Sequence, residues 1–217
     1  MYNCICYYNS ATTYPNFYSG TMYYCCATPM PLGSWNITNE PLFVDRLNGD
    51  FRLASNSPCI NSGYNNSPLL GLVDFAGNPR IVGGTVDLGA YEYQTPGSIL
   101  SYYWAQQYGL PTDGSADFAD PDGDGMSNWQ EWIAGTNPTN AASVLKMLTL
   151  TNSTSGVQLT WQSVTSRDYI LERSTNLLAQ PAFYWIKSYI VGATNTTTYT
   201  DTTATNGGPY FYRVRVQ

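Results

Sequence analysis

Apolar and polar residues alternate with a period of two through residues 143–217, which is the pattern of half-buried β-strands. The alternating inward positions are Val157, Leu159 and Trp161; Tyr169 and Leu171; and Tyr210, Tyr212, Val214 and Val216. Turn-forming clusters separate these runs, at 152–156, 175–181, 192–195 and 203–209. The segment predicts a small all-β sandwich of about six strands, one fewer than the usual seven, and so predicts an open sheet edge.

Residues 1–95 contain only short β-like runs, broken by Asn, Gly and Pro. The runs are Tyr2–Tyr8, Thr21–Ala27, Pro41–Val44, Asp50–Ala54, Cys59–Ser62, Arg80–Val82 and Val86–Tyr91. Strands this short gain stability by stacking in successive coils. Cys25 follows Cys4 by 21 residues, about the length of one coil. The segment therefore predicts coils of a parallel β-helix.

Helical signals occur only between residues 96 and 142. Apolar spacing over 98–108 predicts one helix, which ends at Gly109, and a second short helix is expected from Asn128 to Ala134. The fold class is therefore mainly β. The predicted domains are β-helix coils (1–95), a helical linker (96–142) and a β-sandwich (143–217).

Residues 120–131 match the pattern of a calcium loop in six positions. Acidic side chains alternate at the start, a glycine permits a sharp turn, and a glutamate closes the loop with two oxygens. Calcium takes six to eight oxygen ligands at roughly 2.3–2.6 Å, and close carboxylates repel one another without a cation. The predicted ligands are Asp120, Asp122, Asp124, the Met126 carbonyl, Asn128 (directly or through water) and Glu131.

Four sequence words resemble the last coils of bacterial secreted or surface right-handed parallel β-helix proteins, of the adhesin-like, polymorphic outer-membrane type. They are Asn39-Glu-Pro-Leu-Phe-Val-Asp45, Gly49-Asp-Phe-Arg-Leu53, Ser57-Pro-Cys-Ile-Asn61 and Asp87-Leu-Gly-Ala-Tyr-Glu92. The resemblance implies a right-handed parallel β-helix over about 35–93. It implies little about activity, because those families combine adhesins, polysaccharide lyases and other proteins.

Two further resemblances concern the rest of the chain. The single acidic loop is similar to the calcium repeats of dockerin and thrombospondin type 3 modules, although dockerins pair through two repeats. The ending Pro209-Tyr-Phe-Tyr-Arg-Val-Arg-Val216 resembles the penultimate strand of fibronectin type III modules. The second resemblance implies a fibronectin type III-like sandwich.

Composition is typical of an extracellular or cell-surface protein, and the β-helix resemblance implies a bacterial, secreted one. Only 11% of residues are charged, the net charge is −6, and Tyr occurs 19 times. No basic stripe is present to contact phosphates, so no nucleic-acid partner is expected. No apolar run has the length of a membrane span. The start of the sequence has no signal peptide, so we expect the C-terminal part of a larger protein.

The residue inventory argues against an enzyme. The chain contains no His, which excludes mechanisms that need an internal histidine base or histidine metal ligand. A lyase would need acidic residues and a basic Arg or Lys on one coil face. The candidates are Asp45, Arg46, Asp50 and Arg52, and ordinary surface ion pairs explain them better.

Cysteine and asparagine residues suggest covalent modification in an oxidising compartment. Five cysteines without a metal-binding spacing predict either buried thiols or a disulfide from Cys59 to Cys25 or Cys26. Possible glycosylation sites lie at Asn36, Asn65, Asn152 and Asn195. The paired tyrosines either stack on sugars or form ladders between coils.

We therefore expect a non-enzymatic extracellular calcium-binding structural protein. It is expected to self-associate through exposed β-edges into a fibre or surface array, because both the first coil and the sandwich leave backbone groups unpaired. Two alternatives remain: an adhesin or carbohydrate-binding module of a larger surface protein, with glycan partners, and the non-catalytic tail of a secreted polysaccharide-degrading enzyme.

Overall fold

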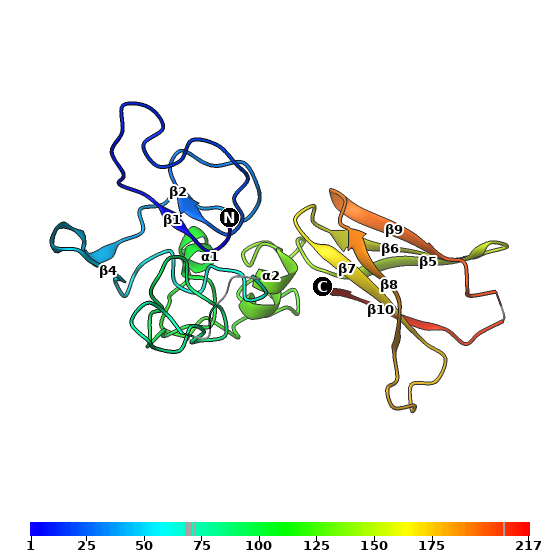
Figure 1. Cartoon of the computed structure of the whole chain (residues 1–217). Coiled ribbons are helices and arrows are strands. Elements are labelled where there is room, and N and C mark those ends of the chain that lie inside the picture. Colours follow the sequence, from blue (N-terminus) through cyan, green and yellow to red (C-terminus); the bar gives the residue numbers. More distant parts are fainter. Residues whose placement is uncertain (68–70, 72, 206) are drawn as a thin grey trace. The chain divides into compact units, whose positions relative to one another are not determined.

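The computed structural model describes residues 1–67, 71, 73–205 and 207–217. The chain is mainly β and forms two compact units, Met1–Ala119 and Asp120–Gln217 (Figure 1). The predicted linker over 96–142 is divided between them: the first helix belongs to the first unit, and the calcium loop with the second helix belongs to the second. In the described residues, no helix is long and apolar enough to cross a membrane.

Parallel pairing organises the start of the first unit. β1 (Ile5–Cys6) pairs in parallel with β2 (Cys26–Ala27), with Ile5 opposite Cys26 and Cys6 opposite Ala27. An isolated parallel bridge joins Tyr2 to Tyr23 with the same offset. The predicted pairing distance of 21 residues is therefore confirmed, whereas the closed right-handed β-helix stays a prediction.

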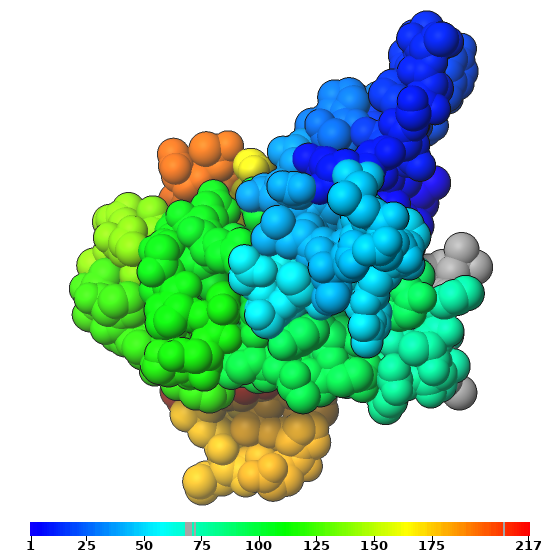
Figure 2. All heavy atoms as spheres, turned by 90° about the vertical axis from the view of Figure 1, so that its left-hand side faces the viewer, coloured from blue at the N-terminus to red at the C-terminus, as the bar shows by residue number. Residues whose placement is uncertain are grey.

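Aromatic rings follow the same offset. The rings of Tyr2 and Tyr23 stack with centroids 5.2 Å apart. Stacking between parallel-paired segments agrees with one of the two uses that the sequence offered for its tyrosines, the ladder, while the coils themselves stay a prediction. The long connection from β1 to β2 is the dark-blue arm that projects from the first unit in Figure 2, and it has exposed Tyr14 and Tyr18 in edge-to-face contact.

A short hairpin follows the parallel strands. β3 (Phe43–Asp45) and β4 (Asp50–Leu53) pair antiparallel around a 3₁₀ turn, η1 (Arg46–Asn48). The predicted turn at 48–50 is confirmed, and Gly49 lies in the left-handed region with φ of 83°.

Buried polar side chains stabilise residues 74–93, which contain no regular strand. The carboxylate of Glu92 accepts hydrogen bonds from the backbone of Val82 at 2.9 Å and of Asp87 at 3.0 Å, and it contacts Arg80 at 3.3 Å. Asp87 in turn accepts a hydrogen bond from Tyr93 N at 2.6 Å. These side chains replace the missing ladder bonds, because buried N–H groups need acceptors.

The two predicted helices form at the expected places. α1 (Tyr102–Gln107) is shorter than predicted, because the Ser101 side chain accepts a hydrogen bond from Trp104 N and so caps the helix there. The preceding Ser98 instead donates to Asp117 at 2.6 Å. α2 (Asn128–Ala134) has the predicted bounds.

Six strands of the second unit form two three-stranded antiparallel sheets (Figure 1). One sheet has the order β5-β6-β9 and the other the order β10-β7-β8. The strands are β5 (Met147–Ser153), β6 (Gly156–Ser163), β7 (Asp168–Ser174), β8 (Tyr184–Val191), β9 (Asn195–Asp201) and β10 (Phe211–Val216). The predicted strand count is confirmed, and the fibronectin type III-like closure stays a prediction.

Both sheets contribute to one hydrophobic cluster. Val157 and Leu159 of β6 pack in the same cluster as Leu171 of β7, and all three are buried. The predicted inward faces of β6 and β7 are confirmed. The inward residues of β10 are only half-buried, as is expected at a sheet edge.

Asp201 joins the two sheets through polar contacts. This buried carboxylate at the end of β9 accepts hydrogen bonds from Arg173 of β7 at 2.6 Å and from the Tyr212 hydroxyl of β10 at 2.9 Å. Burial alone would raise the pKa of Asp201. Hydrogen bonds from Thr203 and Tyr212, with the charge of Arg173, lower this pKa below its ordinary value.

We predict that Asp201→Asn lowers the free energy of unfolding by about 3 kcal/mol at pH 7, because Arg173 then lacks its anionic partner. A carboxyl with a lowered pKa stabilises the fold above its unfolded-state pKa, and this contribution is lost as the pH falls. The difference between wild type and variant should therefore shrink below about pH 4. Urea denaturation of the full chain measures it.

Asp168→Asn is the matched control, because Asp168 is exposed on β7. Its effect should stay within about 0.5 kcal/mol. Equal losses for the two variants, or a loss for Asp201→Asn that does not depend on pH, would contradict the role of Asp201.

Candidate metal centre

The predicted calcium loop lies at the start of the second unit, directly before α2. Its aspartates wind the backbone into tight turns, because each side chain accepts hydrogen bonds from N–H groups further along. Asp120 accepts from Gly123 N at 2.8 Å and from Gly125 N at 3.0 Å. Asp124 accepts from Met126 N at 2.7 Å. Gly125 has φ of 96°, as the predicted sharp turn requires.

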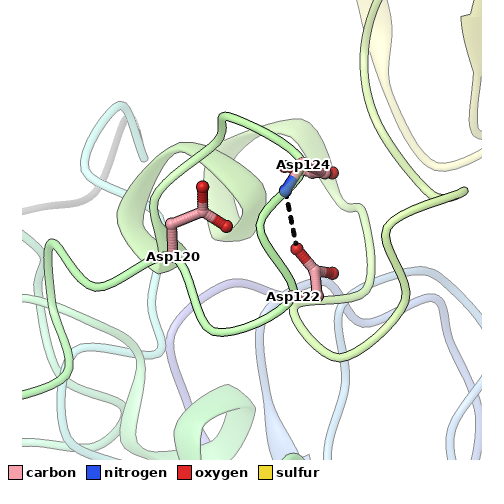
Figure 3. Close-up of side chains that lie close together, drawn as sticks. All are labelled: Asp120, Asp122 and Asp124. Carbon is pink, nitrogen blue, oxygen red and sulfur yellow. Dashed lines mark hydrogen bonds between the residues drawn. The ribbon is translucent and has the colours of Figure 1, made fainter.

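Three aspartates converge in this loop. Asp120, Asp122 and Asp124 each offer a carboxylate oxygen, and these oxygens lie within 4.8 Å of one another (Figure 3). A hydrogen bond of 3.3 Å from Asp124 N to Asp122 Oδ1 holds the turn between the last two. The spacing of two residues therefore brings the carboxylates together, as the sequence predicted.

Glu131 approaches from α2. The helix begins with a capping box, in which Ser127 and Gln130 bond to each other's backbone N–H groups. Glu131 lies one turn inside the helix and is 0% exposed. Its Oε1 accepts a hydrogen bond from the Thr136 hydroxyl at 3.2 Å. The glutamate side chain is thereby held on the buried side of the helix.

Three buried carboxylate oxygens at this site have no hydrogen-bond partner. They are Asp122 Oδ2, Asp124 Oδ2 and Glu131 Oε2. A buried carboxylate oxygen without a donor is costly, because it loses its hydration and gains nothing in exchange. The three belong to three predicted ligands. Their position fits a cation that is coordinated by oxygen alone.

The electrostatics of Glu131 agree with this geometry. Burial, followed by the negative charges of Asp122, Asp124 and Asp120, raises the pKa of Glu131 to about 7. Glu131 therefore lies near enough to the aspartates to feel their charge, although the group of carboxylate oxygens within 4.8 Å of one another contains the three aspartates and not Glu131. All donors here are hard oxygens, which suit calcium or magnesium and do not suit metals that prefer thiolate or imidazole.

The remaining two predicted ligands lie in the same segment. Asn128 is the first residue of α2 and is buried. The Met126 sulfur accepts a hydrogen bond from Leu145 N at 3.4 Å, so this side chain points toward the chain that leads into β5. Coordination by the Met126 carbonyl and by Asn128 stays a prediction.

Sequence reasoning missed Arg167, which anchors α2 to the sheets. Its Nε donates to Ile133 O at 2.6 Å and its Nη2 donates to Trp132 O at 2.7 Å, so the guanidinium satisfies carbonyls at the end of the helix. Arg167 precedes β7 directly. A turn arginine shortly before a strand gave no sequence signal for this contact.

The cysteines divide between two hydrophobic clusters. Cys26 and Cys59 belong to one cluster, and Cys25 belongs to another, in which Cys4 packs. All five cysteines are free thiols. A hydrogen bond with Cys26, together with burial, raises the pKa of the Cys59 thiol. Of the two predicted pairings, the structure brings together Cys59 and Cys26, and the disulfide itself stays a prediction.

The four predicted glycosylation sites differ in their surroundings. Asn36 and Asn65 donate their amide nitrogens to backbone carbonyls, of Met22 at 2.9 Å and of Gly84 at 2.7 Å. A glycan on either nitrogen would replace one of its two N–H donors and would have to fit beside this contact. Asn152 on β5 and Asn195 at the start of β9 are exposed. Modification of any of the four stays a prediction.

The four residues considered for lyase chemistry have structural contacts. Asp50 and Arg52 form an exposed ion pair at 2.5 Å, Asp45 caps η1, and the Arg46 guanidinium lies 4.3 Å from the centre of the Tyr8 ring. These are surface contacts of a hairpin, as expected from the sequence.

Comparisons with known proteins give no match: neither a family model, nor a curated protein, nor a solved structure corresponds to this chain. The functional argument therefore rests on the residues themselves.

Proposed function

We propose that this chain is a non-enzymatic, extracellular structural protein whose second unit is stabilised by calcium. The observation that supports this most directly is the set of three buried carboxylate oxygens without hydrogen-bond donors, on Asp122, Asp124 and Glu131. A cation at their centre would replace the missing donors and cancel the mutual repulsion.

The loop is connected to the sheets by contacts that would transmit this stabilisation. Glu131 lies in α2, and the carbonyls at the end of α2 are held by Arg167. Gln162 of β6 also donates to Ala142 O at 2.8 Å, on the segment that joins the helix to β5. A calcium ion that fixes the loop therefore also fixes the position of α2 against the sheets of the same unit.

Self-association through a β-edge is the second part of the proposal. Within the described residues, β10 pairs only with β7 and forms the edge of its sheet. Its inward residues Tyr212, Val214 and Val216 are half-buried. An edge strand presents N–H and C=O groups that pair readily with another strand. The proposed occupant is an extended segment of a second copy, which would cover these side chains and give a head-to-tail array.

We predict opposite effects of Glu131→Gln with and without calcium. In excess chelator the variant should unfold at a higher temperature than wild type, because one of four mutually repelling carboxylates is neutral. In calcium at a hundred times the dissociation constant, wild type should gain about 2.7 kcal/mol, and the variant should gain much less. Differential scanning calorimetry and titration calorimetry measure the two effects.

Asp113→Asn is the matched control for the ion. It removes one acid from the same acidic region, but Asp113 accepts its side-chain hydrogen bonds from Ser115 and lies before the loop. This variant should keep the full calcium response. An absence of calcium binding by wild type, or an equal response of both variants, would contradict the proposed site.

We predict that association depends on the outward backbone groups of β10. Successive N–H groups of an edge strand point alternately to its neighbour and to solvent. Proline has no backbone N–H. Of the two variants Val214→Pro and Arg215→Pro, one therefore removes an N–H that bonds to β7, and the other removes only an N–H that points away from β7. The variant that keeps its circular dichroism and melting temperature should be monomeric in calcium by sedimentation velocity, under conditions in which wild type forms oligomers. A wild type that stays monomeric at high concentration would contradict self-association.

A further inference from the structure

The outer face of the β10-β7-β8 sheet carries an unusual row of side chains. Arg213 of β10 lies opposite Glu172 of β7, and Glu172 lies opposite Trp185 of β8. The register of β7 and β8 shifts between Leu171 and Glu172, and the pairs after the shift, Glu172 with Trp185 and Arg173 with Tyr184, are consecutive. Within a consecutive stretch, directly opposite residues of antiparallel strands point to the same side of a sheet. The arginine, the glutamate and the tryptophan therefore form one row across the three strands.

Glu172 orients two arginines in this row. Its Oε2 accepts a hydrogen bond from Arg213 Nε at 2.6 Å, and its Oε1 lies 3.4 Å from Arg215 Nε. The carboxylate side chain is only 9% exposed, whereas the arginine side chains are 54% and 53% exposed. Burial raises the pKa of Glu172, but the hydrogen bonds and charges of Arg213 and Arg215 lower it overall, so the carboxylate is ionised at neutral pH.

Both contacts use the Nε atom. The terminal nitrogens of each guanidinium are therefore available to a second acceptor, and the plane of Arg213 is further fixed by the Phe183 ring, whose centre lies 4.4 Å from Arg213 Cζ. Two arginines and one glutamate leave a local charge of +1 on a chain whose net charge is −6. A planar carboxylate matches the geometry of a guanidinium fork, with two parallel hydrogen bonds.

The third member of the row supplies a flat apolar surface. Trp185 is 70% exposed, which is unusual for a large aromatic residue on a sheet face. Its edge strand has no described neighbour on the other side. The indole and the arginines lie on the two strands that flank β7, with Glu172 between them. An indole and oriented cations on one sheet face fit a chain of rings that are apolar on their faces and anionic at their rims. A pyranose ring with a carboxylate substituent has this combination.

We propose that this face binds an acidic polysaccharide, through uronic-acid rings that stack on Trp185 and whose carboxylates bond to Arg213 and Arg215. Glu172 is a positioning residue in this site, because it holds both guanidinium groups and does not contact the sugar. The face contains no residue of the predicted calcium loop, and it uses side chains of β10 where the proposed association uses the backbone of that strand. It therefore adds a ligand to the structural role proposed above.

The test uses the full chain in calcium and a tetramer of galacturonic acid, which is short enough to remain in solution. Titration calorimetry should detect binding that weakens as salt is raised, because ion pairs are screened. Trp185→Ala removes the stacking surface, and the double variant Arg213→Gln, Arg215→Gln removes the charge-assisted hydrogen bonds, so each should weaken binding by about tenfold or more. Arg213→Lys keeps the charge but lacks the fork, and it should also bind more weakly than wild type.

Two matched controls isolate the site. Tyr184→Ala removes an exposed aromatic residue that lies next to Trp185 in β8 but opposite Arg173, on the other side of the strand. Arg52→Gln removes an exposed arginine of the first unit. Both controls should bind the tetramer as wild type does, and melting temperatures should show that every variant is folded.

The ligand series identifies the chemistry. The methyl ester of the same tetramer has the same rings without the charge, and it should not bind at comparable concentrations. Equal binding of the ester would contradict the role of the arginines. Stronger binding of a sulfated neutral tetramer would assign the anion as sulfate and overturn the carboxylate. If Arg52→Gln weakens binding as much as the double variant does, binding is general charge attraction and the proposed site is rejected.

Discussion

The burial of Glu131 among three aspartates is the constraint on which the second unit depends. A carboxylate that is 0% exposed and faces like charges is unfavourable by itself. The surrounding contacts nevertheless hold it in place: a capping box starts its helix, Thr136 donates to one of its oxygens, and Arg167 binds the carbonyls at the helix end. Such a local concentration of negative charge is unfavourable by itself, and the proposed cation would offset it.

Arginine–carboxylate pairs have two different roles in the second unit. The role depends on whether the arginine side chains are buried or exposed. Asp201 is buried, accepts hydrogen bonds from both neighbouring strands of the opposite sheet, and leaves little of Arg173 exposed. Its contribution is to hold the sheets together. Glu172 is also largely buried, but its two arginines are exposed on the outer face. The same chemistry there orients cations toward solvent, where a ligand can reach them.

The first unit obtains its order from side chains more than from strands. Its strands are two to four residues long, too short to be stable as isolated ladders. Two kinds of side-chain contact compensate for the short strands. Aromatic rings stack between residues that are paired in parallel, and buried polar side chains around Glu92 bind the backbone. This explains why the residues between 74 and 93 keep a defined backbone without regular secondary structure.

The sequence by itself determined the local features of this protein. The alternation in 143–217 predicted the six strands, the helical signals of 128–134 predicted α2, and the spacing of the aspartates predicted that their carboxylates converge. Each of these depends on neighbours within a few residues, so periodicity and turn chemistry are sufficient. The start of α1 was misplaced by a local competition, because Ser98 bonds to Asp117 and Ser101 caps the helix instead.

Only the tertiary structure decided which distant residues meet. Arg167 reaches α2, Asp201 reaches β7 and β10, Cys59 reaches Cys26 rather than Cys25, and Glu172 aligns Arg213 with Trp185. The contacts between strands depend on strand order and register, because a shift of one residue in register would turn a strand side chain such as Glu172 or Arg213 to the opposite face. A single sequence does not contain the relative placement of strands, since pairing energies between strands are similar for many alignments and the packed core selects one of them.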